Sequence, residues 1–322
     1  KKTAARLGQD ASVYSRVMGP LVANWEKLVA DLLDIPQFPH HPVAFGRFGL
    51  AAIRSARSFA ESTFRTEGAR ALFAGIAAHS ILPLEKPPSA AFGLILAVLG
   101  HAVGWPFARG GSQRLSDALV SYLCSLGGQV VTGAAVKSVD ELPLSRAVLC
   151  DVSPRELLRL ASHRLTPGYC RKLGDYRYGP GAFKLDWALD GPIPWKAREC
   201  ARAGTVHLGG TLEEIAEAER QVWNGEHPEK PFVILVQSSL FDRTRAPEGK
   251  HTAWAYCHVP SGATFDMSER MEKQIERFAP GFRSRIIARS VMPPARLEQG
   301  NANFIGGAIT GGVHDFRQLL GR

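Results

Sequence analysis

Residues 105–153 read WPFARGGSQRLSDALVSYLCSLGGQVVTGAAVKSVDELPLSRAVLCDVS, and this stretch decides the expected fold. Arg109-Gly110-Gly111-Ser112 predicts a tight turn at the start of a helix, because the Ser112 hydroxyl can accept a hydrogen bond from a free backbone N–H. We expect the helix to end at Gly127-Gly128, since glycine tolerates the left-handed conformation that helix ends often require.

The apolar residues of this helix recur with a period of 3.6 residues and therefore share one face. They are Leu115, Leu119, Tyr122, Leu123 and Leu126. Short strands are expected at 129–132, which is β-branched, and at 146–151, which is apolar. Together these patterns predict a helix packed on a buried sheet.

The order Pro-x-x-x-Gly-Gly, helix, Gly-Gly-x-Val and strand resembles the middle of the flavin-dependent amine-oxidase and phytoene-desaturase superfamily. Within it, the chain is most similar to bacterial phytoene dehydrogenase-like oxidoreductases. Further matching segments are ARALFAGIAAHSILPL (69–84), RYGPGAFKLDWALDGPIPW (177–195), AGTVHLGGTLEEIA (203–216), GKHTAWAYCHVP (249–260), QIERFAPGF (274–282) and NFIGGAITGGVHDFRQLL (303–320). The resemblance therefore covers essentially the whole chain.

The resemblance implies FAD as the cofactor, and it implies which residues would lie near the flavin. Val136 would contact the adenine end through its backbone, and Asp151 would end the adjacent strand. The other implied positions are Pro106, Gly110, Gly111, Gly306, Gly307, Gly311 and Gly312. For each glycine, a plain turn is the alternative.

Two features of the family are not found in the sequence. The family begins with a strand, a G-x-G-x-x-G turn and a helix, and it ends with a second glycine-rich flavin contact. The family also often carries an acidic residue where Ala308 stands. These departures lead us to expect the central part of a longer protein.

The expected fold class is α/β, or α+β, with a mixed sheet covered by helices and part of a Rossmann-like FAD-binding lobe. We expect the helical part of a substrate domain at 1–104 and part of the FAD-binding domain at 105–155. The mixed-sheet substrate domain would follow at 156–295, and a C-terminal FAD-binding segment would begin at 296–322.

Local patterns predict the elements on either side of residues 105–153. Residues 1–64 are mainly amphipathic and helical, with a break at Pro36, Pro39 and Pro42, and two more helices are expected at 45–59 and 67–81. Beyond 156, alternating apolar residues predict strands at 183–189, 205–208, 232–238 and 252–259, and a helix at 268–279. Thr211 and Glu214 form a capping box, which predicts the start of another helix.

Aromatic residues of the expected sheet are candidates for lining an apolar substrate cavity. Trp187, Trp254 and Tyr256 alternate along their strands, and core packing is the alternative for all three. His79, His101 and Trp105 are candidate catalytic or cavity residues, although a histidine in so apolar a setting is more often a core residue.

The sequence lacks the motifs of other catalytic classes. The sequence has no G-x-S-x-G elbow, P-loop, H-E-x-x-H or kinase motif set. Flavin chemistry needs none of these, because the cofactor supplies the hydride acceptor and the protein supplies orientation and an apolar pocket. The five cysteines are an odd number with wide spacings, which argues against a metal site and a disulfide framework. We therefore expect reduced cysteines and a cytoplasmic protein.

The net charge is +9, but the 39 basic residues are scattered, and no nucleic-acid motif accompanies them. We therefore expect no nucleic-acid partner; attraction to anionic lipid or to a dinucleotide phosphate remains an alternative. The apolar run 90–107 predicts a buried helix, with a peripheral membrane contact as the alternative. The sequence leaves the oligomeric state open.

Two hypotheses for function follow. The first is an FAD-dependent oxidoreductase that dehydrogenates or isomerises an apolar, polyene or lipid-like substrate by hydride transfer to flavin. The second is a scaffold without cofactor that binds an apolar ligand or a partner protein.

Overall fold

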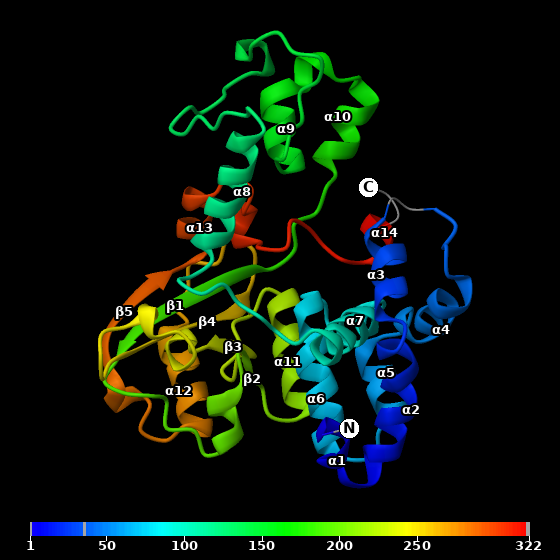
Figure 1. The fold of residues 1–322 in the computed structure, drawn as a ribbon, viewed down its shortest axis with the longest axis vertical. Helices are drawn as coiled ribbons and strands as arrows, with labels where there is room; N and C mark the ends of the chain where they lie inside the picture. The colour runs from blue at the N-terminus through cyan, green and yellow to red at the C-terminus, as the bar shows by residue number, and fades with distance from the viewer. Residues whose placement is uncertain (1, 35–36, 320–322) are drawn as a thin grey trace.

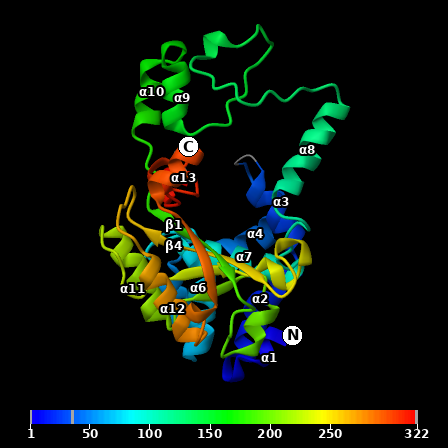
Figure 2. The same ribbon diagram turned by 90° about the vertical axis from the view of Figure 1, so that its left-hand side faces the viewer.

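The computed structural model describes residues 2–34 and 37–319, so the expected helix break at Pro36 lies outside the described residues. A layer of N-terminal helices packs against one end of a five-stranded sheet, and two arms extend from this body (Figures 1 and 2). The sheet separates two hydrophobic cores, one shared with the helical layer and one beneath its opposite face.

The first part of the chain is helical, as predicted. Its helices are α1 (Lys2–Ala5), α2 (Ala11–Val22), α3 (Trp25–Leu33), α4 (Pro42–Ala52), α5 (Ala56–Thr63), α6 (Glu67–Ala77) and α7 (Ser89–Ala102). The single helix expected at 45–59 is wrong: the Ser55 side chain accepts a hydrogen bond from the Ser58 N–H and starts a new helix, α5.

Helix α7 forms the centre of the helical layer. Leu94 and Val98 are fully buried, which confirms the buried helix predicted from the apolar run. Among the described residues, no helix combines the length and the apolar character needed to cross a bilayer.

The strands are β1 (Gly181–Leu189), β2 (Val206–Leu208), β3 (Val233–Val236), β4 (His251–Val259) and β5 (Ile286–Met292), in the order β2-β3-β4-β1-β5. The α/β class is confirmed, but the sheet is not mixed, because each of the strand pairings in the described residues is antiparallel. In the long central pair, Lys184 lies opposite Tyr256, and Asp186 lies opposite Trp254.

The two faces of β1 have different surroundings, as its alternating sequence predicted. Phe183, Leu185 and Leu189 are buried against α12 (Ser268–Phe278). On the opposite face, the β2–β3 end of the sheet packs against α6 and α11 (Leu212–Trp223). The predicted capping box of α11 is present: the Thr211 side chain accepts from the Glu214 N–H, and the Glu214 side chain accepts from the Thr211 N–H.

The arm that begins with α8 (Gln113–Ser125) departs from expectation. The helix and its end at Gly127, with φ of +85°, are confirmed. Ser112, however, makes no side-chain capping bond, none of the residues of α8 is buried, and the side chain of Leu119 is 70% exposed. The strands expected at 129–132 and 146–151 are absent, because the described residues supply no neighbouring strand to pair with them.

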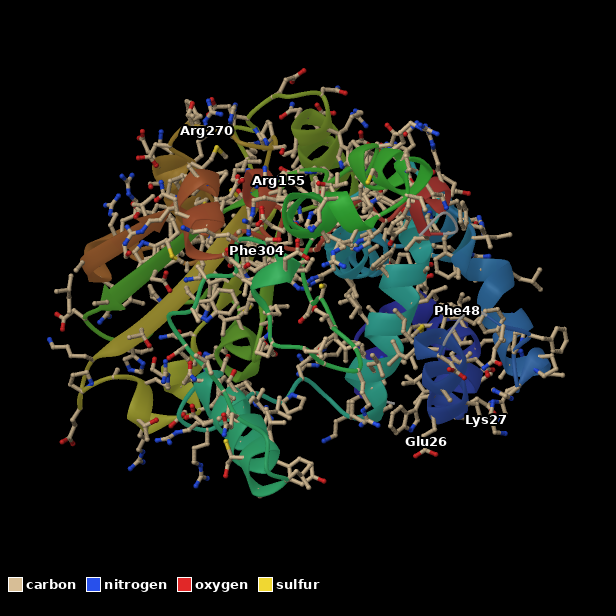
Figure 3. The ribbon with its side chains drawn as sticks, turned by 90° about the horizontal axis from the view of Figure 1, so that it is seen from above. Glu26, Lys27, Phe48, Arg155, Arg270 and Phe304 are labelled. Carbon is tan, nitrogen blue, oxygen red and sulfur yellow. The ribbon has the colours of Figure 1, made fainter. Side chains whose placement is uncertain are left out.

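The second arm contains α9 (Pro154–Ala161) and α10 (Pro167–Gly174), and the C-terminal segment contains α13 (Pro294–Gly300) and α14 (Phe316–Leu319). The Ser153 N–H donates to the Asn303 side chain at 2.7 Å, and Arg155 forms an ion pair with Glu298. Figure 3 shows Arg155 beside the tail that carries Phe304. The second arm is therefore attached to the C-terminal segment.

Two histidines join the helical layer to the sheet. His79, in the turn after α6, and His207, on β2, are linked through their Nε2 atoms at 2.9 Å. The ring that accepts at Nε2 must be neutral, while the other ring donates its Nε2–H. Burial lowers the pKa of His79 to about 4 and that of His207 to about 3.

We therefore predict that acid destabilises the fold. Above pH ~6.5 both the folded and the unfolded chain are neutral at these rings, but below it the unfolded chain binds protons that the folded chain excludes. The free energy of unfolding should fall by about 2 kcal/mol for His79 between pH 7.5 and pH 5. Urea denaturation at these two pH values measures the loss.

The matched variants are His207→Gln, which keeps a hydrogen-bonding group without a titrating ring, and His40→Gln at an exposed site. The first should weaken the pH dependence and the second should leave it unchanged. Equal pH dependence in the wild-type protein and His207→Gln would contradict the assignment.

Candidate functional site

A cavity of about 320 Å³ lies between the 105–112 turn and the sheet, next to the first residues of α8. Its walls come from that turn, from strands β1, β3 and β4, and from the connection between β3 and β4. The lining residues are Phe107, Ala108, Gly111, Ser112, Asp186, Trp187, Val236, Ser238, Arg245, Thr252, Ala253 and Trp254. The predicted turn and one of the predicted aromatic strand residues, Trp254, thus meet at this cavity.

The glycine turn is fixed to the sheet by two residues that sequence analysis did not identify. The Gly110 N–H donates to Asp242 Oδ2 at 2.6 Å, and Arg245 Nη1 donates to the Gly110 carbonyl at 2.9 Å. The Gly110 N–H is also the main reason that the pKa of Asp242 lies below its usual value, with Thr244 contributing. The N–H and the carbonyl of Gly110 are therefore both held.

Gly111 has a φ of +98°, in the region that favours glycine. A Cβ at this position would lie 2.7 Å from Arg245 Nη1. The local conformation therefore favours glycine here, and an added Cβ would displace the end of the Arg245 side chain.

The face of β1 and β4 that turns toward the cavity carries aromatic and charged side chains. The Trp254 and Tyr256 rings are nearly parallel, at 13°, with centroids 6.4 Å apart. Lys184 Nζ lies 5.7 Å from the Trp254 ring centroid and forms an ion pair with Asp186. Burial raises the pKa of Tyr256 above its usual value, so its hydroxyl stays protonated.

The three aromatic candidates lie on different faces of the sheet. Trp254 lines the cavity, and Tyr256 lies beside it on the same face. The Trp187 indole is buried on the opposite face, where its Nε1 donates to Glu272 Oε1 at 3.0 Å and its ring meets Phe282 edge-on. The side chain of Trp187 thus belongs to the core, the alternative considered from its sequence.

The second glycine-rich segment lies at the other end of β1. A Cβ on Gly181 would approach the Gly306 carbonyl oxygen to 2.4 Å, and a Cβ on Gly307 would approach Pro294 to 2.7 Å. Gly312 faces Tyr176, whose hydroxyl donates to the Gly311 carbonyl. Since Gly181 and Asp186 are five residues apart, these glycines lie about 17 Å from the cavity along β1.

The remaining implied flavin contacts are dispersed. Pro106 is exposed on the chain that enters the turn. Val136 and Asp151 lie in the segment beyond α8, where the Val136 carbonyl accepts from Arg159 Nη2 at 3.3 Å. Val136 therefore lies beside α9 in the second arm, and Asp151 lies two residues before Ser153, whose N–H donates to Asn303 of the C-terminal segment. The implied contacts therefore occupy three separate regions of the described structure.

None of the candidate catalytic residues lines the cavity. His79 belongs to the histidine pair between the layers. His101 Nε2 lies 2.8 Å from the Tyr14 hydroxyl, which joins α7 to α2. Trp105 packs its indole against Gly100 at the end of α7. Each of the three thus makes a contact outside the cavity.

No metal centre is found: the described residues contain no group of three or more histidines, cysteines and carboxylates that could hold a metal ion. The five cysteines are free.

No known family model matches the chain. Pyridine nucleotide-disulfide oxidoreductase domain-containing protein 2 from Mus musculus is 25% identical over 285 residues, which are 74% of this chain and 48% of that protein. The Rattus norvegicus protein of the same name is 24% identical over 282 residues. The chain thus spans about half the length of the curated relatives it matches.

Two solved structures share the fold. An oxidoreductase from Methanosarcina mazei superimposes with a TM-score of 0.55 at 16% identity, over 78% of this chain and 58% of that one. A protein from Pyrococcus furiosus gives a TM-score of 0.51 at 12% identity, over 87% of this chain and 63% of that one. The fold is therefore one that a known oxidoreductase also adopts.

We predict that Asp242→Ala releases the glycine turn. The substitution leaves the Gly110 N–H without its charged acceptor, and charge-assisted hydrogen bonds are the stronger ones. Amide hydrogen exchange across 105–112 should accelerate roughly tenfold or more, as followed by mass spectrometry. Asp117→Ala, which removes an exposed carboxylate from α8, is the control and should leave these rates unchanged. Equal exchange in both variants would show that Asp242 does not hold the turn.

Proposed function

We propose that this chain forms the substrate-binding lobe and part of the cofactor lobe of an FAD-dependent oxidoreductase. The observation that carries the proposal is the glycine turn held by Asp242 and Arg245 over the Trp254 face of the sheet. The names of the mouse relative and of the Methanosarcina mazei structure, both oxidoreductases, support it.

The groups around the cavity suit a flat aromatic ring more than a phosphate. The Gly110 N–H is bound to Asp242, and the Gly111 N–H donates to the Ala108 carbonyl at 3.0 Å, so neither is free for a phosphate oxygen. Phe107 and Trp254 offer aromatic surface, and Arg245 offers a positive charge. A bound flavin would accept a hydride, and Arg245 would stabilise the negative charge that the reduced ring gains.

The substrate we propose is apolar, with the polyene or lipid-like character of phytoene dehydrogenase-like substrates, and the reaction is dehydrogenation or isomerisation. In the described cavity, Asp186 and Arg245 are the lining residues whose side chains carry charge, and no histidine or cysteine accompanies them. Such a lining supports chemistry performed by a cofactor, with the protein orienting the substrate and excluding water.

The exposed face of α8 fits this proposal. Leu115, Leu119 and Tyr122 form an apolar stripe that the described residues leave uncovered. Because the curated relatives are about twice as long, we propose that the remainder of a cofactor lobe covers this stripe.

The test is the visible absorption spectrum of the purified protein, before and after incubation with FAD and removal of the free cofactor. We expect a bound-flavin band, and we expect Arg245→Ala to weaken FAD binding roughly tenfold by removing a charged contact. Arg243→Ala, two residues away and outside the cavity lining, is the matched control.

The same measurement on the longest chain that the gene encodes distinguishes the two hypotheses. Flavin bound only by the longer chain would place the missing contacts outside these residues and keep the proposal. Absence of flavin in both chains, with binding of an apolar fluorescent ligand retained, would overturn it in favour of the scaffold without cofactor.

A further inference from the structure

Four side chains form a block on the face of β1 and β4 that turns toward the cavity. Lys184 and Asp186 are two residues apart on β1 and therefore share this face. Tyr256 lies opposite Lys184, and Trp254 lies opposite Asp186. Asp186 and Trp254 line the cavity, whereas Lys184 and Tyr256 lie next to them along the strands.

Asp186 and Trp254 together offer the groups that bind an ammonium ion. A carboxylate supplies the opposite charge, and the face of an indole attracts a cation that lies within about 6 Å of its centre. The Tyr256 ring, which is inclined by 13° to the Trp254 ring with the centroids 6.4 Å apart, adds a second aromatic surface. A free site of this composition would favour an amine as its ligand.

The chain fills this site with a cation of its own. Lys184 Nζ is ion-paired with Asp186 and lies 5.7 Å from the centroid of the Trp254 ring. The side chain of Lys184 is 25% exposed, so its ammonium group is already largely withdrawn from water. Because this cation is tethered next to its partners, its effective concentration there is high, and a free amine has to displace it.

The other charged residue of the cavity lining adds to this effect. Arg245 donates to the Gly110 carbonyl and lines the cavity, where its positive charge repels a second cation. Asp242 near it is bound to the Gly110 N–H and to Thr244. Among the described lining residues, Asp186 is the one carboxylate, and Lys184 already compensates its charge.

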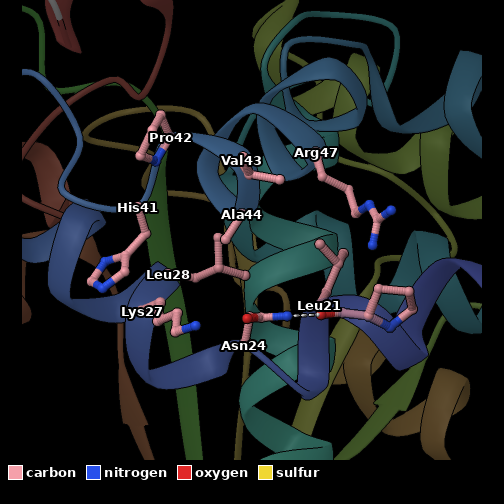
Figure 4. A pocket seen from close by; sticks show the side chains of 10 residues that line it. Leu21, Asn24, Lys27, Leu28, His41, Pro42, Val43, Ala44 and Arg47 are labelled. Atoms are coloured by element: carbon pink, nitrogen blue, oxygen red, sulfur yellow. Dashed lines mark hydrogen bonds between the residues drawn. The ribbon is translucent and has the colours of Figure 1, made fainter.

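A cavity of about 330 Å³ between α2, α3 and α4 lacks this combination. Figure 4 shows Lys27 and Arg47 among its lining residues, beside apolar side chains such as that of Leu28. Its described lining contains no aspartate, glutamate, tryptophan or tyrosine. This second cavity therefore offers an ammonium ion neither a counter-charge nor an indole face.

We propose that Lys184 is a specificity-determining residue that occupies the ammonium site of Asp186 and Trp254 and thereby excludes positively charged substrates from the cavity. The inference rests on the proposed function in taking this cavity as the substrate site, and it narrows the substrate class to molecules without a positive charge. Exclusion by an internal cation is selection against the wrong ligand. The alternative is an ordinary ion pair on a strand, which would have no effect on ligand choice.

The experiment measures the binding of two probes with the same carbon chain, n-hexylamine and 1-hexanol, to the full chain by isothermal titration calorimetry at pH 7.5. The amine is an ammonium ion at this pH, because an alkyl ammonium group such as that of lysine has a pKa of about 10.4. We expect the wild-type protein to bind 1-hexanol more tightly than n-hexylamine. Lys184→Met should bind n-hexylamine roughly tenfold more tightly than the wild-type protein, and it should change the affinity for 1-hexanol by about twofold or less.

Three further variants test the cause of this gain. Lys184→Arg keeps the cation and should behave like the wild-type protein. Lys184→Met combined with Asp186→Asn should lose the gain, because the amine then lacks its counter-charge. Lys250→Met is the matched control: it removes a lysine whose ion-pair partner, Asp190, lies outside the cavity lining, and it should leave both affinities unchanged. Circular dichroism shows whether each variant is folded.

Equal affinity of Lys184→Met and the wild-type protein for n-hexylamine would overturn the proposal, and so would an equal gain in Lys250→Met. Absence of binding of both probes to every variant would also overturn it, because the cavity would then hold no small ligand. FAD binding is measured separately by the absorption spectrum. Failure of the redox proposal and failure of this inference are therefore distinguishable.

Discussion

The pairing of β1 with β4 is the constraint on which the rest of the structure depends. Nine consecutive residues of each strand are in register, and alternation sends one set of side chains to each face. One face closes over α12 with apolar residues, and this core fixes the sheet in place. The other face is therefore free to present Lys184, Asp186, Trp254 and Tyr256 to the cavity and to the helical layer.

A second contact depends on that sheet. Asp242 lies in the connection between β3 and β4, and it reaches the Gly110 amide from a position 132 residues later in the chain. The geometry of the turn is therefore set by the sheet domain as well as by its own glycines. A ligand in the cavity would touch the turn, the sheet and the start of α8 together.

Much of this organisation could be predicted from local sequence. The β1 alternation, the Thr211–Glu214 capping box and the apolar run of α7 each encode their structure within a few residues, and all three are confirmed. A glycine also predicted a helix end locally: Gly127 ends α8 with a positive φ, as expected.

Long-range partners could not be predicted in the same way. The strands expected at 129–132 and 146–151 have suitable composition, but a strand forms only when a neighbour satisfies its backbone groups. Trp187 alternates in phase with the apolar residues of β1, whereas Trp254 is in phase with Tyr256 on β4; the pairing then sets Trp254 opposite Asp186, on the face away from the Trp187 indole. Asp242 and Arg245 carry no motif that links them to Gly110, so their contribution to the site could be found only in three dimensions.

Helix α8 has the geometry of a lever, because it is anchored at one end and extends away from the body. Its first residues are held at the turn, whereas its 13 residues have no packing contact that buries any of them. Because the helix is about 20 Å long, a rotation of about 10° at the turn displaces its far end by about 3 Å. A small rotation at the turn would thus be enlarged at the distant end of the arm.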